Sequence, residues 1–365
     1  MIYRNVELYN VQELVEGGVH DVLSPEVYRR FQAMGTWYTK RARGDRGLWL
    51  CRLPDALRRQ LNPNAQVMAL ATAACEIRLN LHSEAAAFTL GNGWSWPPAV
   101  LDVYQGAFLV NRHALGPEPV RIEIALPPNM AELRRLTAER RLPYDADLTR
   151  VVLPYCASTR LLNMEGDLAL PEPHQVPARR LLFYGSSITH GYCAQGPMDS
   201  YAQLTAMSLG MDPINLGLGG AAHLEPEMAD YIAGRGDWDV AVLEMGINIL
   251  GAISTEEFAR RVDGFVTRIA RAHPDKWVFC IDLFTCAHDL AGTAKIATFR
   301  QIVRQQVAKL ALPRLVYVCG EALLTSASGL TADLVHPSPA GMAEIAHRLV
   351  QVIVSATGTS PASQE

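Results

Sequence analysis

A serine, an aspartate and a histidine in the second half of the chain are the residue types that acyl transfer requires. Ser187 follows Gly185 and Ser186 directly after an apolar run, and Asp333 lies three residues before His336 in a loop near the C-terminus. In such a set the serine hydroxyl attacks a carbonyl, the histidine takes its proton, and the aspartate holds the imidazole in the required tautomer. The residues therefore predict acyl transfer with Ser187 as nucleophile, His336 as general base and Asp333 as the partner of His336.

Each of these features also has an ordinary structural explanation. Serine and glycine are common in any tight turn after a strand, so the run from Gly185 to Ser187 is a weak signal alone. Asp333 can be a turn former, and His336 can be a histidine near the start of a helix. The chemical interpretation depends on all of the features occurring together.

Two further segments contain groups that could donate hydrogen bonds to an anion. One ends at Gly220, and the other contains Asn248, two residues after Gly246. A glycine lets the backbone approach a substrate closely and donate its N–H, and an asparagine adds a neutral side-chain donor. The structural alternatives are a strained connection at residues 217–220 and a helix cap at Asn248.

The elements that must position these residues alternate between strand and helix from Arg179 onward. Short runs rich in β-branched residues predict buried parallel strands, and strands alternating with helices predict an α/β layered domain. The candidate residues all follow successive strands, so they should meet at the carboxyl edge of one sheet. The predicted strands are residues 180–184, 213–216, 240–245, 277–283 and 314–319, and the predicted helices are 200–209, 226–233, 255–272, 294–311 and 339–355.

The first half of the chain has a different pattern of apolar residues. Short apolar or alternating runs separated by turns predict an all-β sandwich. The predicted strands include residues 47–51, 66–70, 75–81 and 120–126, with turns at 91–93 and 126–129 and a helix over 130–141. A proline-rich segment at 171–177 predicts a boundary. We therefore expect a β-sandwich domain at 1–177, a catalytic domain at 178–355 and a disordered tail at 356–365.

Taken together, Gly185-Ser186-Ser187, Gly220, Asn248 and the Asp333/His336 pair resemble, in order, the four sequence blocks of the SGNH (GDSL) hydrolase superfamily. The resemblance covers about residues 180–345. It implies a flavodoxin-like three-layer αβα domain. It also implies an oxyanion hole made by the backbone N–H groups of Ser187 and Gly220 and the Asn248 side chain.

The resemblance has two departures, and a further part of it concerns the first domain. Ser186 replaces the usual aspartate before the nucleophile, and Ile249 replaces a carboxylate after Asn248. The preceding domain is similar to the N-terminal jelly-roll-like domain of a two-domain branch, several members of which act on acylated carbohydrates. The chain also resembles GDSL acyltransferases that move an aryl-acyl group onto tetracycline-type polyketides in antibiotic biosynthesis.

Four residues are weaker candidates for substrate binding. Trp94 and Trp96 fall in a predicted loop, where they could stack on a sugar or aromatic ligand, or form a hydrophobic plug at the domain interface. His190 and His223 lie three residues after Ser187 and Gly220, and could line an acyl pocket. Surface or loop histidines are the favoured interpretation of both.

Bulk properties exclude several classes of function. The net charge of −4 is spread without long like-charge runs, which argues against nucleic-acid or anionic-membrane binding. The N-terminus lacks the basic start and apolar run of a signal peptide, so we expect a cytoplasmic protein. The seven cysteines include no Cys-x-x-Cys pair and the ten histidines no ligand spacing, so we expect free thiols and no metal.

These observations predict a reaction but leave its acceptor open. Because acyl-CoA thioesters are intracellular, we expect an acyltransferase that moves an acyl group from a CoA-type thioester to a hydroxyl of a glycosylated natural product. An esterase acting on acylated carbohydrates or small esters is the alternative, and a binding protein with a vestigial hydrolase domain is an alternative of another class. The expected partners are a small-molecule acyl donor and acceptor, with no cofactor. The sequence does not indicate the oligomeric state.

Overall fold

The computed structural model describes residues 1–33, 46–95, 99–116 and 118–358. The chain divides into two compact units. Within the described residues, the first consists of Met1–Ala178 and Gly196–Met198, and the second of Arg179–Gln195 and residues 199–358. No helix within the described ranges combines the length and the apolar character that crossing a membrane requires.

The first unit contains two antiparallel sheets. The larger has the order β1-β2-β5-β10-β7-β8, with β12 paired to β5, and the smaller has the order β3-β4-β11-β6-β9. The larger sheet comprises β1 (Ile2–Tyr3), β2 (Val6–Tyr9), β5 (Glu76–Leu81), β7 (Val100–Gln105), β8 (Phe108–Ala114), β10 (Thr149–Val152) and β12 (Leu168–Ala169). The smaller comprises β3 (Glu13–Gly17), β4 (Gly47–Cys51), β6 (Ala85–Ser95), β9 (Val120–Ala125) and β11 (Ala157–Glu165). The helices are α1 (Val19–Val22), α2 (Pro25–Ala33), α3 (Asp55–Arg58), α4 (Pro63–Met68) and α5 (Met130–Arg140), and a 3₁₀ turn, η1, covers Pro173–Gln175.

Two local predictions for the first half are wrong. The predicted strand at 66–70 lies largely in helix α4, which Asn62 caps by accepting the N–H of Ala65 at 3.0 Å. A five-residue apolar run fits a buried helix as well as a strand, so its hydrophobic period does not distinguish the two. The predicted turn at 91–93 lies inside β6, where a Cβ on Gly93 would fall 2.2 Å from the ring of Trp49.

A buried charge cluster ties two strands of the larger sheet together. Glu76 of β5 accepts hydrogen bonds from Arg150 of β10 at 2.5 and 2.8 Å and from Arg78 at 2.8 Å. The Arg150 guanidinium also lies 3.5 Å from the ring centroid of Tyr144. Burial alone would raise the pKa of Glu76, but the charges and hydrogen bonds of Arg150 and Arg78 lower that pKa to about 2.

The second unit is built on a five-stranded parallel sheet of order β14-β13-β15-β16-β17. This is the flavodoxin-like order, in which the first strand lies inside the sheet. The strands are β13 (Arg180–Gly185), β14 (Asp212–Gly217), β15 (Val240–Glu244), β16 (Trp277–Ile281) and β17 (Leu315–Val318). The longer helices are α7 (Tyr201–Ser208), α8 (Pro226–Gly234), α9 (Thr255–Ala272), α11 (Ala294–Leu310) and α13 (Pro339–Thr357).

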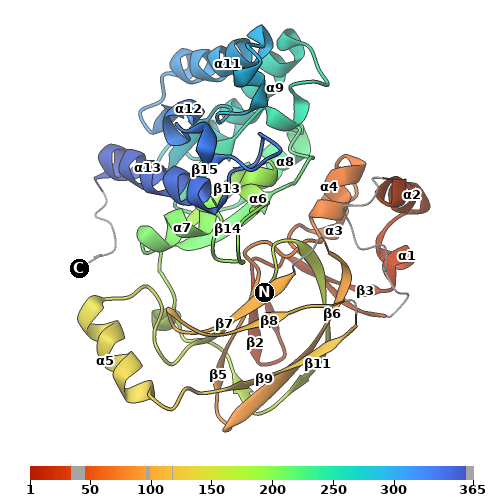
Figure 1. Cartoon of the computed structure of the whole chain (residues 1–365), viewed down its shortest axis with the longest axis vertical. Helices are drawn as coiled ribbons and strands as arrows, with labels where there is room; N and C mark the ends of the chain where they lie inside the picture. Colours follow the sequence, from red (N-terminus) through yellow and green to blue (C-terminus); the bar gives the residue numbers. More distant parts are fainter. Residues whose placement is uncertain (34–45, 96–98, 117, 359–365) are drawn as a thin grey trace. The chain divides into compact units, whose positions relative to one another are not determined.

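Helices cover both faces of this sheet, which gives three layers (Figure 1). On one face, Phe183 of β13 packs in a core with Tyr201 of α7 and Met342 of α13. On the other, the ring of Tyr184 lies 4.7 Å from that of Phe265 in α9, and α9 packs against α8 and α11. Neighbouring residues of one strand thus serve opposite layers, as expected for a sheet buried on both sides.

Short elements complete the second unit. These are α6 (Ser187–His190), α10 (Ala287–Leu290), α12 (Gly320–Leu323) and the 3₁₀ turns η2 (Ile247–Ile249) and η3 (Ala327–Gly329). The expected tail began at residue 356, but α13 continues to Thr357. From residue 359 onward the expected tail lies outside the described residues. The predicted α/β class of this domain and the antiparallel β-rich character of the first half are confirmed.

Candidate active site

The nucleophile candidate opens a one-turn helix at the carboxyl end of β13. The strand ends at Gly185, and Ser187 is the first residue of α6. Ser186 caps this turn, since its hydroxyl accepts the N–H of Ile188 at 3.2 Å. The turn ends at Gly191, whose φ of 109° favours glycine. The half-buried Ser187 is thereby fixed at the edge of the sheet.

Three of the residues singled out in the sequence form one hydrogen-bonded chain. The Oγ atom of Ser187 lies 2.8 Å from Nε2 of His336, which is 149 positions away along the chain. Nδ1 of His336 lies 2.7 Å from Oδ2 of Asp333. This geometry is the one in which an imidazole can take a proton from a serine hydroxyl.

Asp333 is bound by several donors besides the imidazole. Its Oδ1 atom accepts the backbone N–H groups of Val335 and His336, each at 2.9 Å, and the hydroxyl of Thr331 at 2.8 Å. Partial burial alone would raise the pKa of Asp333, but these hydrogen bonds together outweigh it and lower that pKa to about 2. The side chain is therefore a carboxylate at neutral pH.

The loop that carries this aspartate and histidine is held from both sides. The N–H of Thr331 donates to the carbonyl of His336 at 2.8 Å, and the N–H of Ala287, at the start of α10, donates to the carbonyl of Leu334 at 2.6 Å. The ring of Tyr192, just beyond α6, lies 4.3 Å from the imidazole of His336. Sequence reasoning missed Tyr192 and Ala287, because their contacts bridge distant segments.

The two candidate anion-binding residues follow the next strands. Gly220 lies exposed in the loop after β14 with φ of 65°, and Asn248 lies in η2 after β15. The side-chain oxygen of Asn248 accepts the N–H of Ala222 at 3.1 Å, so its amide NH₂ is the group left to donate. Both residues thus follow carboxyl ends of strands adjacent to β13, where the sequence predicted them.

His190 has a different environment from the one predicted. Its ring is fully buried, and Nδ1 lies 2.9 Å from the carbonyl oxygen of Gly217. The surface or loop interpretation is therefore wrong, and the buried ring offers no face to a substrate. His190 instead ends the nucleophile turn α6 and ties it to β14, from which Asn215 also donates to the carbonyl of Thr189 at 2.7 Å.

The remaining weak candidates are His223, Trp94 and Trp96. His223 is half-buried in the loop before α8, where burial lowers its pKa. The loop placement of Trp94 is wrong. It lies in strand β6, buried, with its ring 5.4 Å from that of Trp49, so it has no exposed face for stacking on a sugar. Trp96 lies outside the described residues.

Sequence reasoning missed a buried carboxyl group below the nucleophile turn. Glu244 ends β15 with 1% of its surface exposed. Its Oε2 atom accepts the N–H of Ser186 at 2.5 Å and the hydroxyl of Thr189 at 3.1 Å. A single acidic residue in an otherwise apolar strand, two positions before Gly246, was the available signal.

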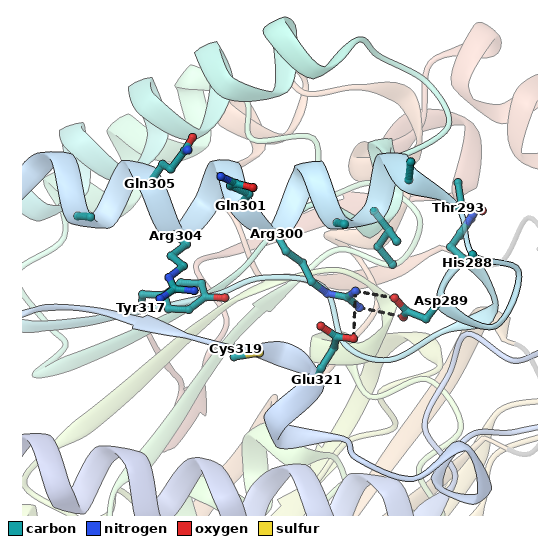
Figure 2. Close-up of a pocket in the computed structure, with 15 residues that line it drawn as sticks. His288, Asp289, Thr293, Arg300, Gln301, Arg304, Gln305, Tyr317, Cys319 and Glu321 are labelled. Atoms are coloured by element: carbon teal, nitrogen blue, oxygen red, sulfur yellow. Dashed lines mark hydrogen bonds and ion pairs between the residues drawn. The ribbon is translucent and has the colours of Figure 1, made fainter.

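A cavity of about 790 Å³ lies beside α11 and β17, and none of the predicted site residues lines it. Figure 2 shows that Arg300 is fully engaged there, with ion pairs to Asp289 at 2.5 Å and Glu321 at 3.4 Å. Arg300 also donates to the carbonyls of Leu283 and Phe284. Through Asp289 it holds α10, the helix whose Ala287 supports the loop at 331–336.

The cysteines are free thiols, and five of the seven are buried. In the part of the chain that the structure describes, no group of three or more His, Cys, Asp or Glu side chains could hold a metal ion.

Comparison with known proteins agrees with this arrangement. Residues 183–344 match the model of the GDSL-like lipase/acylhydrolase family. No curated protein matches the sequence. The salicylyl-acyltransferase SsfX3 from a tetracycline biosynthetic pathway has a similar structure, with 17% identity and a TM-score of 0.74, over 98% of this chain and 97% of SsfX3.

Carbohydrate esterases also share the fold. A family two carbohydrate esterase from Clostridium thermocellum is 16% identical, with a TM-score of 0.58 over 80% of this chain and 94% of the esterase. One from Cellvibrio japonicus is 16% identical, with a TM-score of 0.56 over 77% and 88%. Residues 183–344 therefore resemble a GDSL-like lipase/acylhydrolase domain, and the chain shares its fold with the acyltransferase and with the carbohydrate esterases.

Proposed function

We propose that this protein is a serine acyltransferase that moves an acyl group from a CoA-type thioester to a hydroxyl group of a glycosylated natural product. The observation that carries the proposal is the hydrogen-bonded chain from Ser187 through His336 to Asp333, with distances of 2.8 and 2.7 Å. Donor and acceptor are both small molecules. The reaction needs no cofactor, because the thioester itself supplies the activated acyl group.

In the first half-reaction the hydroxyl of Ser187 attacks the thioester carbonyl. Nε2 of His336 takes the hydroxyl proton, and the Asp333 carboxylate stabilises the resulting imidazolium through Nδ1. The carbonyl oxygen becomes an oxyanion that accepts hydrogen bonds from the N–H groups of Ser187 and Gly220 and from the Asn248 amide. The intermediate collapses, the carbon–sulfur bond breaks, and the leaving thiolate takes the proton from His336.

In the second half-reaction His336 removes the proton of the acceptor hydroxyl, which attacks the acyl-enzyme ester. Collapse of this second tetrahedral intermediate breaks the bond to Ser187 Oγ, and His336 returns the proton to that oxygen. Water can replace the acceptor with the same groups in the same roles, and the enzyme is then an esterase. Transfer and hydrolysis therefore differ in what the site admits, not in its catalytic groups.

The similarity to the salicylyl-acyltransferase favours transfer, because it covers nearly the whole of both chains, 98% and 97%. The second candidate is a carbohydrate esterase. It is favoured by the family two esterases, which share the fold over 80% and 77% of this chain.

Intact-protein mass spectrometry with a panel of aliphatic and aromatic acyl-CoAs tests the proposal, with Ser187→Ala as control. We expect a mass increase on the wild type alone, discharged faster by glycosylated acceptors than by buffer. No adduct with any thioester, together with turnover of acetylated sugars, would replace the acyltransferase by the esterase. Absence of labelling of Ser187 by a fluorophosphonate would favour the binding protein with a vestigial hydrolase domain.

A further inference from the structure

The nucleophile turn rests on a buried carboxyl group that the mechanism above does not use. Glu244 reaches from the end of β15 to the backbone of the neighbouring strand's turn, where Oε2 accepts the N–H of Ser186 at 2.5 Å. The same oxygen accepts the hydroxyl of Thr189 at 3.1 Å. One atom therefore binds the residue before Ser187 and a residue in the same one-turn helix.

Gly185 is the residue that allows this approach. A Cβ atom at position 185 would lie 2.4 Å from Oε2 of Glu244 and 2.3 Å from Oγ1 of Thr189. Any larger side chain would push the carboxyl group away from the turn. The glycine of the Gly-Ser-Ser run is thus explained by the carboxyl group beneath it.

The surroundings of Glu244 supply hydrogen-bond donors but, among the described residues, no ion-pair partner. No basic side chain of the described residues forms an ion pair with it, and burial raises its pKa. The titratable groups that face it are the phenols of Tyr184 and Tyr201, whose pKa values burial raises as well. Oε1 of Glu244 has no hydrogen-bond partner. What Glu244 supplies to the turn is therefore the acceptor oxygen Oε2.

We propose that Glu244 is a positioning residue for acyl transfer: through the acceptor oxygen Oε2, it fixes the Ser186 peptide and helix α6 so that Ser187 Oγ meets Nε2 of His336. This inference rests on the proposed function, because it concerns the same nucleophile. It assigns the role to the position of an oxygen atom rather than to a negative charge. A variant that keeps the charge but shortens the side chain should therefore lose activity. A variant that removes the charge but keeps the length of the side chain should retain it.

The next strand offers a matched control. Asp282, just after β16, is fully buried, and accepts the N–H of Gly320 and the hydroxyl of Tyr317, each at 2.6 Å. Burial raises its pKa too. It has the same combination of partners as Glu244, one backbone N–H and one hydroxyl, but it holds the start of α12 instead of the nucleophile turn.

The experiment compares Glu244→Gln, Glu244→Asp, Asp282→Asn and Ser187→Ala in the full chain, with p-nitrophenyl acetate as substrate. Glu244→Gln removes the titratable carboxyl group but keeps an acceptor oxygen at full reach, and we expect kcat within about threefold of the wild type. Glu244→Asp keeps the charge but withdraws the oxygen by one methylene. We expect its kcat to fall about 10²-fold with KM nearly unchanged, as small misplacements of reacting groups do. Asp282→Asn should keep the wild-type kcat.

A loss in Glu244→Gln equal to that in Glu244→Asp, or a wild-type kcat in Glu244→Asp, would overturn the assignment. If Glu244→Asp does not fold, Thr189→Val removes one donor to the same oxygen, and should lower kcat about tenfold by the same misplacement. An unchanged kcat there would also overturn it. Equal rates for wild type and Ser187→Ala would be a different result. They would show that Ser187 forms no acyl-enzyme, and would overturn the proposed function together with the role of Glu244.

Discussion

Asp333 holds His336 at two points: its Oδ2 atom lies 2.7 Å from the imidazole Nδ1, and its Oδ1 atom accepts the backbone N–H at 2.9 Å. The ring and the backbone of one histidine are thus bound by the two oxygens of one carboxylate. Since only two residues separate them in the sequence, this pair is a local unit within one loop. The orientation of the proposed base is therefore set inside that loop, which Ala287 and Tyr192 contact from other segments.

Asp333→Asn should lower kcat for p-nitrophenyl acetate by about 10⁴-fold, with a smaller change in KM. The amide oxygen can still accept the backbone donors, but the NH₂ group faces Nδ1 and favours the wrong imidazole tautomer. Steady-state kinetics measure the effect, and circular dichroism serves as the folding control. A loss below tenfold would contradict the role of Asp333 as the partner of His336.

Asn248→Asp should lower kcat by about 10²- to 10³-fold, the usual cost of removing one donor from an oxyanion hole. The variant keeps the oxygen that accepts the N–H of Ala222, so the loop retains its bond. It loses the NH₂ group and adds a negative charge near the developing anion. Kinetics with the same ester check this, and an unaltered kcat would exclude Asn248 from the oxyanion hole.

Glu76→Gln should destabilise the first unit by about 3–5 kcal/mol at neutral pH, because it leaves buried Arg150 and Arg78 without their counter-charge. The pKa of Glu76 is about 2 in the folded protein, below its ordinary value of 4.5. Its contribution is thus present above pH 4.5 and is lost as the pH falls through about 2.

Urea unfolding of wild type and Glu76→Gln across this pH range measures that contribution. The difference in the free energy of unfolding should be constant above pH 4.5 and shrink toward pH 2. A difference that stays constant down to the lowest pH would mean that the carboxylate charge is not what stabilises the cluster.

Gly185→Ala should destabilise the second unit by about 1–3 kcal/mol and lower kcat, since its Cβ would overlap Thr189 and Glu244. Gly234→Ala, at the end of α8, is the matched control because a Cβ there meets nothing within 4 Å. Thermal unfolding should separate the two variants. Equal midpoints would show that the nucleophile turn tolerates a side chain.

The residues with strong chemical requirements could be predicted from the sequence. Ser187, Asp333 and His336 belong to short segments after apolar runs, and the parallel order of those runs brings them to one edge. Glu244 could not be predicted in the same way. Its hydrogen-bond partner, Ser186, is 58 residues away, and a lone acidic residue at a strand end has an ordinary explanation as a surface group.

The two errors at Gly93 and Trp94 have a common physical cause. Gly93 resembles a turn residue, but it is glycine because the ring of Trp49 occupies the space of its side chain. Trp94, the next residue, has the sequence context of an exposed aromatic residue, but it is buried and its ring packs near that of Trp49. Such contacts join strands that are far apart in the sequence, so the hydrophobic period of a short run does not predict them.

The separation of 149 positions between Ser187 and His336 also sets the order in which a growing chain acquires its parts. At the usual pace of synthesis, roughly 7 to 30 s pass between the two. All five parallel strands end by Val318, so every strand of the sheet is synthesised before the histidine. A nascent chain thus contains the proposed nucleophile before it contains the proposed base. We expect it to have no acyl-transfer activity until the segment with His336 has been synthesised.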